Sequence, residues 1–301
     1  MKEDIRSYAK LGLVHHMLYP KCTCDADFHM DTLIEFSRRK DIETFDCCLP
    51  YGDERRERIT EELLKCDKQI VYALHLFPSR KISLSSRDIQ EQAMTRIIIK
   101  DQIDMAVKIG AKGFVFVSGA DDPDHREEAR AAFKAFCRWF CKELKPYDIT
   151  ALLEPFDRTI DKKYLYGPID DCIGLMDDLS EEFDNIGIEL DMAHLPLMSE
   201  EFGSAIARCG RYIKRVHLGN CVKCNVNNPW YGDKHPPMDF EEGEISKKEL
   251  KIILESLLDI GYLSKEKRGA LVMEMQPYPD KTPDYTIKRT MKLLDEAWNE
   301  I

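Results

Sequence analysis

Short apolar runs bounded by turn residues recur along the whole 301-residue chain, and segments with helical periodicity lie between them. Apolar runs of this length predict strands buried in a sheet. The expected strands are residues 11–18, 42–49, 70–77, 113–118, 150–156, 186–192, 215–219 and 270–276.

Amphipathic helices are expected between these strands, and most begin near an acidic residue or a serine that can cap the first turn. The clearest are residues 88–109, 124–144, 168–183, 247–258 and 284–298. Regular alternation of strand and helix predicts a parallel sheet, and eight units predict a single (β/α)8 TIM barrel domain over residues 1–301. An open doubly wound sheet would give the same alternation and stays as the alternative.

The composition is that of a globular protein without a membrane span. Hydrophobic residues make up 44% of the chain, charged residues 33%, and the mean hydropathy is -0.41. No window approaches the roughly 18 consecutive apolar residues that a spanning helix requires. The start, MKEDIRSYAKLG, has neither the apolar segment nor the cleavage site of a secretory signal, which predicts a cytoplasmic protein. The eleven cysteines do not suggest a disulfide framework, so reduced thiols are expected.

The net charge argues against nucleic acid as a partner. The chain carries 44 Lys and Arg against 55 Asp and Glu, a formal charge of -11. Because phosphate backbones are bound mainly by positive side chains, this balance would repel them.

Acidic residues and histidines stand where four consecutive strands end. Residues at the carboxyl ends of the strands form the open face of such a barrel, where reactive groups lie. The fifth to eighth strands end in LLEPF, ELDMAH, RVHLGN and VMEMQP, which contribute Glu154, Asp191, His194, His217 and Glu274. Converging carboxylates repel one another unless a cation holds them, and this oxygen-rich set suits Mn²⁺, Mg²⁺, Co²⁺ or Zn²⁺.

With these motifs the chain resembles the xylose isomerase-like TIM-barrel superfamily of sugar isomerases and epimerases, which also includes zinc-dependent abasic-site endonucleases. The resemblance implies a divalent metal, with Mn²⁺ expected first, held by Glu154, Asp191, His217 and Glu274. In an isomerase or epimerase, Glu154 and Glu274 would exchange a substrate proton through an enediolate. The resemblance also implies a sugar or sugar derivative as substrate and a homo-oligomer as an expected state.

The segment GDKHP provides a second pair of metal-type side chains. In the related endonucleases a loop after the seventh strand carries Asp-x-His and binds a further zinc with the histidine of the sixth strand. Asp233 and His235 match that pair and His194 the third member, although the segment could also be a simple turn. A metal-dependent hydrolase or lyase is therefore the alternative enzyme. Its other histidines match less well, because only His75 stands at the end of the third strand.

The fourth strand ends in VFVSGAD, so Ser118 and Asp121 stand where the endonucleases supply another histidine. The ketose epimerases in turn carry a further Glu just past the ligand of the fifth strand, a place that Asp157 or Asp161 could take. A third alternative is a barrel that binds sugars without catalysis.

Cationic and aromatic residues near the rim are candidates for substrate binding. Arg and Lys could hold a phosphate or carboxylate, and aromatic rings could stack on a sugar, although surface exposure or ordinary packing would explain them equally. The candidates are Arg158, Lys162, Trp230 and Phe156, with Lys163, Tyr231 and Phe77 beside them.

Overall fold

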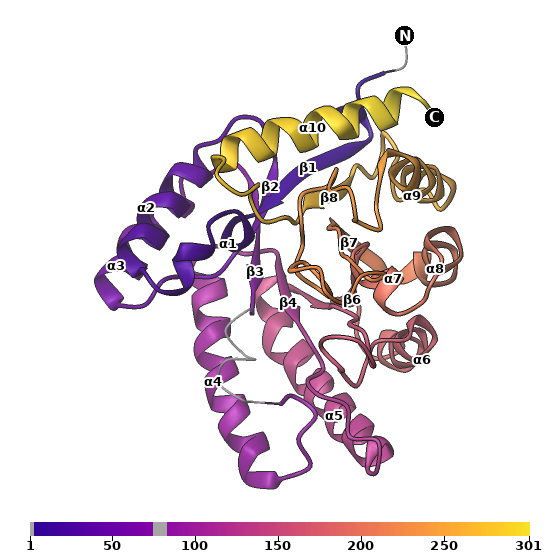
Figure 1. Cartoon of the computed structure of the whole chain (residues 1–301). Coiled ribbons are helices and arrows are strands. Elements are labelled where there is room, and N and C mark those ends of the chain that lie inside the picture. The colour runs from indigo at the N-terminus through magenta and orange to yellow at the C-terminus, as the bar shows by residue number, and fades with distance from the viewer. Residues whose placement is uncertain (1–2, 75–82) are drawn as a thin grey trace.

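Eight parallel strands form a closed barrel in which each strand pairs with its neighbours in chain order and β8 pairs with β1 (Figure 1). The computed structural model describes residues 3–74 and 83–301. His75 and Phe77 lie outside these residues. The strands are β1 Ala9–Val14, β2 Thr44–Cys47, β3 Gln69–Ala73, β4 Gly113–Phe116, β5 Thr150–Leu153, β6 Ile186–Asp191, β7 Ile213–Leu218 and β8 Gly269–Met273. The closed order confirms the (β/α)8 barrel and excludes the open doubly wound sheet.

Helices surround the barrel, as Figure 1 shows. The α-helices are α1 His15–Leu18, α2 Ala26–Ser37, α3 Asp53–Leu63, α4 Ile89–Lys108, α5 Arg126–Leu144, α6 Ile169–Ser180, α7 His194–Leu197, α8 Phe202–Cys209, α9 Lys247–Asp259 and α10 Pro283–Asn299. Short 3-10 helices are η1 Ile5–Ser7, η2 Pro20–Thr23, η4 Lys145–Tyr147 and η5 Gly210–Tyr212. In the part of the chain that the structure describes, no helix has the length and apolarity to cross a bilayer.

Side-chain caps fix where several helices begin. The Asp88 carboxylate accepts hydrogen bonds from the first turn of α4, and Ser246 forms a capping box with Glu249 at the start of α9. At the start of α10 the Thr282 side chain accepts a hydrogen bond from the amide of Tyr285. Each cap satisfies amide groups that have no partner inside the helix. The predicted helix boundaries therefore agree with the structure to within a few residues.

The first strand is shorter than predicted. The expected strand covered 11–18, whereas β1 ends at Val14 and the chain turns into α1, where the amide of Tyr19 donates to the carbonyl of His15. An apolar run looks the same in a buried strand and in a buried helical turn, which explains the difference. Strands β5 and β8 also end early, so that Glu154 and Glu274 each lie one residue beyond their strand.

Aromatic packing joins β4 to the helix that covers it. The ring of Phe116 lies 5.1 Å from that of Phe140 and 6.0 Å from that of Phe133, both on α5, and all three are fully buried. Such a cluster combines large buried apolar area with favourable edge and tilted ring contacts.

Replacing Phe116 by Ala is expected to lower the free energy of unfolding by about 3–5 kcal/mol, because it leaves a cavity among rings that cannot collapse into it. Urea unfolding followed by circular dichroism measures this loss. Tyr147→Ala is the control, since Tyr147 is 46% exposed and should change stability little. A loss for Phe116→Ala as small as that of the control would contradict the packing described.

Candidate active site

The structure brings the four expected metal ligands together at the carboxyl ends of β5 to β8. Asp191 ends β6, His217 lies in β7, and Glu154 and Glu274 follow β5 and β8. One donor atom from each of the four lies within 4.8 Å of those of the other three. Asp191, His217 and Glu274 are buried and Glu154 is nearly so. The arrangement can therefore hold one cation with three carboxylates and an imidazole.

His217 lies between two sets of carboxylates. Its Nδ1 is 2.6 Å from Oε2 of Glu274, on the side of the expected metal ligands. Its Nε2 is 3.3 Å from Oδ2 of Asp46 and 3.3 Å from Oε1 of Glu189. Carboxylates on the far nitrogen fix the orientation of a metal-binding imidazole and increase its basicity.

An ionic layer below the rim was not predicted. Asp46, Glu189 and Arg215 are almost fully buried inside the barrel, and the Nε of Arg215 lies 3.1 Å from Oδ1 of Asp46. The Arg215 guanidinium also donates to Thr44 Oγ1 at 3.0 Å. Residues two apart on a strand point the same way, so 189 and 215 face the interior below 191 and 217. A charged residue inside an apolar strand run was the signal that could have revealed this layer.

Replacing Arg215 by Met is expected to lower the free energy of unfolding by about 3–5 kcal/mol, because Asp46 would keep a buried charge without its partner. The double change Asp46→Leu with Arg215→Met should recover most of that loss, since both charges are then gone. Urea unfolding of the two variants gives the comparison. A double variant no more stable than Arg215→Met alone would contradict this explanation.

The GDKHP segment lies against the same rim. Asp191, His194 and His235 bring one donor atom each within 4.8 Å of one another. Oδ1 of Asp233 lies 2.7 Å from Nε2 of His235 and 3.2 Å from that of His194. The other carboxylate oxygen of Asp233 is 2.9 Å from the Lys162 ammonium. The Lys162 ammonium therefore pairs with one oxygen of Asp233, while the other oxygen faces the two histidines.

Two aspartates hold the GDKHP segment and the loop after β5 in place. Both carboxylate oxygens of Asp157 accept backbone hydrogen bonds, from the amides of residues 159, 160, 161 and 162. Asp161 accepts from the amide of Asp233 at 2.9 Å, which ties the two loops together. His235 adopts a left-handed conformation with φ of 50°. The carboxylates of Asp157 and Asp161 thus hold the backbones of the two loops in place.

A cavity of about 220 Å³ opens beside the candidate ligands. Glu154, Glu274, Phe156 and Lys162 line it, and so does His16, which follows β1. Its remaining walls include Tyr164, Leu74 and Val115. The volume is below the roughly 300–1,000 Å³ of drug-sized ligand sites, which suits a small molecule.

Two of the expected substrate contacts lie elsewhere. Arg158 donates to the carbonyl of Leu165 and to the carboxylate of Asp171, and it is not among the cavity-lining residues. Trp230 packs with its ring 6.1 Å from that of Phe240 and does not line the cavity either. Loop residues near a rim ligand in sequence can point in any direction, which is why these two side chains do not face this cavity. Phe156 does line the cavity, with its ring 4.1 Å from that of His194.

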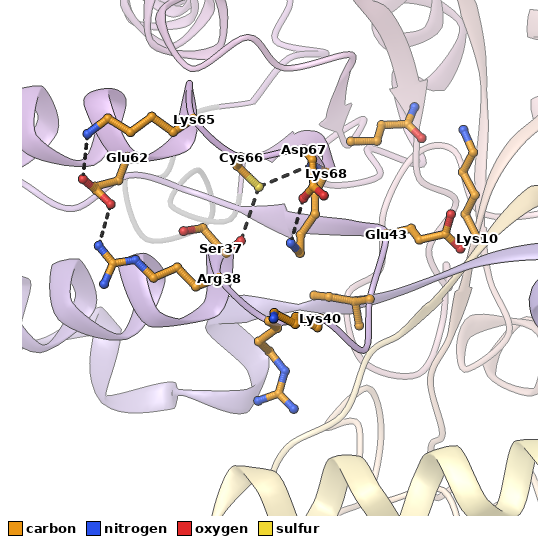
Figure 2. Close-up of a pocket in the computed structure, with 13 residues that line it drawn as sticks. Lys10, Ser37, Arg38, Lys40, Glu43, Glu62, Lys65, Cys66, Asp67 and Lys68 are labelled. Atoms are coloured by element: carbon orange, nitrogen blue, oxygen red, sulfur yellow. Dashed lines mark hydrogen bonds and ion pairs between the residues drawn. The ribbon is translucent and has the colours of Figure 1, made fainter.

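A larger hollow, about 930 Å³, lies at the opposite end of the barrel, and Figure 2 shows the residues that line it. Its walls come from Lys10 near the start of β1 and from the segments before β2 and β3, including Glu43 and Lys68. Many of its charges are already paired, as with the Lys68 ammonium and Asp67, which are joined by a hydrogen bond of 3.1 Å. In barrels of this kind the end where the strands begin serves stability and the other end carries reactive groups.

The electrostatics of the rim show an excess of negative charge. Burial raises the pKa of Glu154 well above its usual range, and Glu189 and Glu274 raise it further. Burial also raises the pKa of Glu189, to about 8. Burial alone would lower the pKa of His217, but Glu189 and Glu274 outweigh it and raise the pKa well above the usual value. The imidazole thus partly compensates acids that a bound cation would stabilise more strongly.

Buried carboxylate oxygens without hydrogen-bond partners also indicate that the donor set fits a divalent metal. Among the described residues, buried oxygens without a hydrogen-bond partner include Oδ2 of Asp191 and both carboxylate oxygens of Glu189. The other oxygen of Asp191 accepts from the amides of Ala193 and Gly219, which holds the carboxylate in position. A buried carboxylate oxygen without a partner is costly unless a cation binds it. Oxygen-rich ligands with one imidazole suit Mn²⁺ or Mg²⁺ better than thiolate-preferring metals.

The fold and rim define a (β/α)8 barrel whose open end gathers carboxylates and histidines around one small cavity. Comparison with protein families gives the same result, because the model of the xylose isomerase-like TIM barrel matches residues 34–297. The chain belongs to this family. The resemblance inferred from its motifs is thereby confirmed.

Solved structures with a similar fold include epimerases and an endonuclease. A D-tagatose 3-epimerase-like protein is 14% identical, with a TM-score of 0.72 over 97% of this chain and 99% of that one. A D-psicose 3-epimerase solved in the presence of D-fructose is 14% identical, with a TM-score of 0.66 over 96% and 97%. A family 2 AP endonuclease from Brucella melitensis is 16% identical, with a TM-score of 0.65 over 92% and 96%. At such identities the likeness concerns the fold. Comparison with curated proteins finds no match.

Proposed function

We propose that the protein is a divalent-metal-dependent isomerase or epimerase that acts on a sugar or sugar derivative. The observation that carries this proposal is the convergence of Glu154, Asp191, His217 and Glu274 within 4.8 Å at one end of a small cavity. Epimerases among the proteins of similar fold support the reaction class.

The metal would be held by the same four residues, with Mn²⁺ as the expected ion. When bound, such an ion stabilises negative charge that develops on substrate oxygens during proton removal. His217 would be kept in position by Asp46 and Glu189 on its Nε2 side. The ionic layer below the rim is then part of the support of the site, in addition to its contribution to the barrel core.

Two carboxylates would move the proton. Glu154 follows β5 and Glu274 follows β8, three strands further around the barrel, and both line the cavity. A small substrate between them can lose a proton from carbon to one carboxylate and gain one from the other. General acid and base groups placed in this way contribute about 10²–10⁴-fold to a rate.

The remaining walls would bind the substrate and exclude water. Phe156 and Tyr164 provide apolar surface, and their rings lie 5.2 Å apart. Lys162 and His16 provide polar contacts in the same cavity. Apolar surface beside several charged and polar side chains can orient a small ligand and leave little space for solvent.

The position of Lys162 favours this reaction over multi-metal phosphoester hydrolysis. The Lys162 ammonium lies 2.9 Å from Oδ2 of Asp233, the carboxylate that the GDKHP segment would contribute to a second metal beside His194 and His235. A cation already in contact with the carboxylate repels a second one. We therefore assign the GDKHP segment to substrate binding.

The proposal is tested by incubating the Mn²⁺-loaded protein with a panel of ketohexoses and ketopentoses, with and without a phosphate group, and separating the products by chromatography. We expect at least one sugar to be converted into an isomer or epimer, and the conversion to stop when the metal is chelated. Cleavage of a phosphoester substrate, with no conversion of any sugar in the panel, would instead establish the hydrolase.

A further inference from the structure

Tyr164 lies in the loop after β5 and lines the active-site cavity with a partly exposed side chain. No hydrogen bond joins its hydroxyl to any residue that the structure describes. A phenolic hydroxyl can donate one hydrogen bond and accept others, and it usually has a partner where it is taken out of water. A free hydroxyl in the wall of a cavity therefore offers a hydrogen bond to a molecule that enters.

The charges around Tyr164 indicate which way its hydroxyl points. Burial raises the pKa of the hydroxyl, the Lys162 ammonium lowers it, and the carboxylates of Glu154 and Asp233 raise it again. Lys162, Glu154 and Asp233 all line the same cavity. Because the effect of a charge declines with distance, the hydroxyl lies on the cavity side of the ring. Since its pKa is raised overall, it keeps its proton at neutral pH and can donate it to a hydrogen bond.

Backbone hydrogen bonds fix the position of Tyr164. Its amide donates to the carbonyl of Asp157 at 2.9 Å, within the loop after β5. Tyr164 also forms an isolated antiparallel bridge with Ala120, and the amide of Asp121 donates to the carbonyl of Lys163 at 2.8 Å. The loop after β5 is therefore tied to the segment after β4, and the backbone of Tyr164 is held from both sides.

The ring of Tyr164 is held by other rings. It lies 5.2 Å from the ring of Phe156, and the two planes are inclined by 62° in an edge arrangement. Phe156 in turn packs with its ring 4.1 Å from that of His194. Edge contacts of this kind are favourable between aromatic side chains. Because backbone and ring are both fixed before a ligand arrives, little conformational freedom is lost when the hydroxyl binds one.

We propose that Tyr164 is a substrate-binding residue whose hydroxyl donates a hydrogen bond to an oxygen of the bound sugar. This inference rests on the proposed function, because it takes the molecule in the cavity to be a sugar. The contacted oxygen lies on the part of the sugar near Glu154 and Lys162. A site that hydrogen-bonds a substrate hydroxyl rejects analogues that lack it. Tyr164 therefore helps to determine which sugars the protein accepts.

Sugar binding tests this role without requiring turnover. Isothermal titration calorimetry of the Mn²⁺-loaded protein gives the Kd of each ketose in the panel for the wild type and for Tyr164→Phe, which removes only the hydroxyl. We expect Tyr164→Phe to raise the Kd of the best-bound sugar about 3–10-fold, the effect of one neutral hydrogen bond. Tyr166→Phe is the matched control, because Tyr166 is buried in the same loop and does not line the cavity. Its Kd should equal that of the wild type.

Monodeoxy analogues of the best-bound sugar locate the contact. One analogue should bind the wild type about 3–10-fold more weakly than the parent sugar does, and Tyr164→Phe should bind this analogue as tightly as the wild type does. An unchanged Kd for the parent sugar, an equal loss with every analogue, or no binding of any sugar to the wild type would overturn the proposal. Binding with the expected pattern but without conversion would refute the proposed reaction alone, whereas conversion with an unchanged Kd would refute the role of Tyr164 alone.

Discussion

Replacing Glu154 by Gln is expected to lower kcat for sugar interconversion by about 10²–10⁴-fold, the contribution of a positioned acid or base. The amide retains the shape of the side chain but cannot accept or return a proton from carbon. Glu274→Gln should have an effect of the same order, because both carboxylates line the cavity and both are needed for a complete transfer. Steady-state kinetics on the converted sugar, with Mn²⁺ in excess, measures both losses.

Glu255→Gln provides the matched control, because Glu255 is exposed on α9, away from the cavity. Its kcat should equal that of the wild type. Retention of wild-type solvent-proton exchange into the substrate by both Glu154→Gln and Glu274→Gln would disprove the proposed roles of the two carboxylates.

Removing His217 is expected to weaken Mn²⁺ binding by more than about 100-fold, since loss of an outer partner of a metal ligand alone costs about 10–100-fold. Asp191→Asn should act in the same direction, because the buried oxygen without a partner then loses its charge. Elemental mass spectrometry after equilibration at fixed free Mn²⁺ gives the content per chain. Mn²⁺ is the suitable probe because it suits an oxygen-rich ligand set with one imidazole.

The double change Asp233→Ala with His235→Ala is the informative comparison. We expect it to leave about one Mn²⁺ per chain, because Asp233 is paired with Lys162 and two histidines and does not belong to the four-residue set. Loss of an ion from a wild type that binds two or more would show that GDKHP binds metal, and would move the search to phosphoesters.

The barrel and the rim were predictable because both follow from strand boundaries. A strand such as β6 is an unbroken buried run, and its last residue, Asp191, faces the open end. Once the strands are located, the residues that end them must meet, which is why the convergence of Glu154, Asp191, His217 and Glu274 could be expected from spacing and family resemblance.

Side-chain direction outside the strands was not predictable. Arg158 follows the fifth strand as closely as Phe156 does, yet it turns toward Asp171 while Phe156 faces the cavity. His15 and His16 are neighbours at the start of a helical turn, and only His16 lines the cavity. Such directions depend on the loop conformation and on partners far away in the chain, and a local pattern does not contain them.

The proposed reaction moves a proton on and off a carbon atom of a sugar. It is tested most directly by incubating the Mn²⁺-loaded protein in D₂O with the ketose panel and following carbon-bound protons by nuclear magnetic resonance. We expect deuterium at one carbon of a sugar that the protein interconverts, and none with Glu154→Gln. Absence of deuterium from every sugar, with the metal bound, would contradict it.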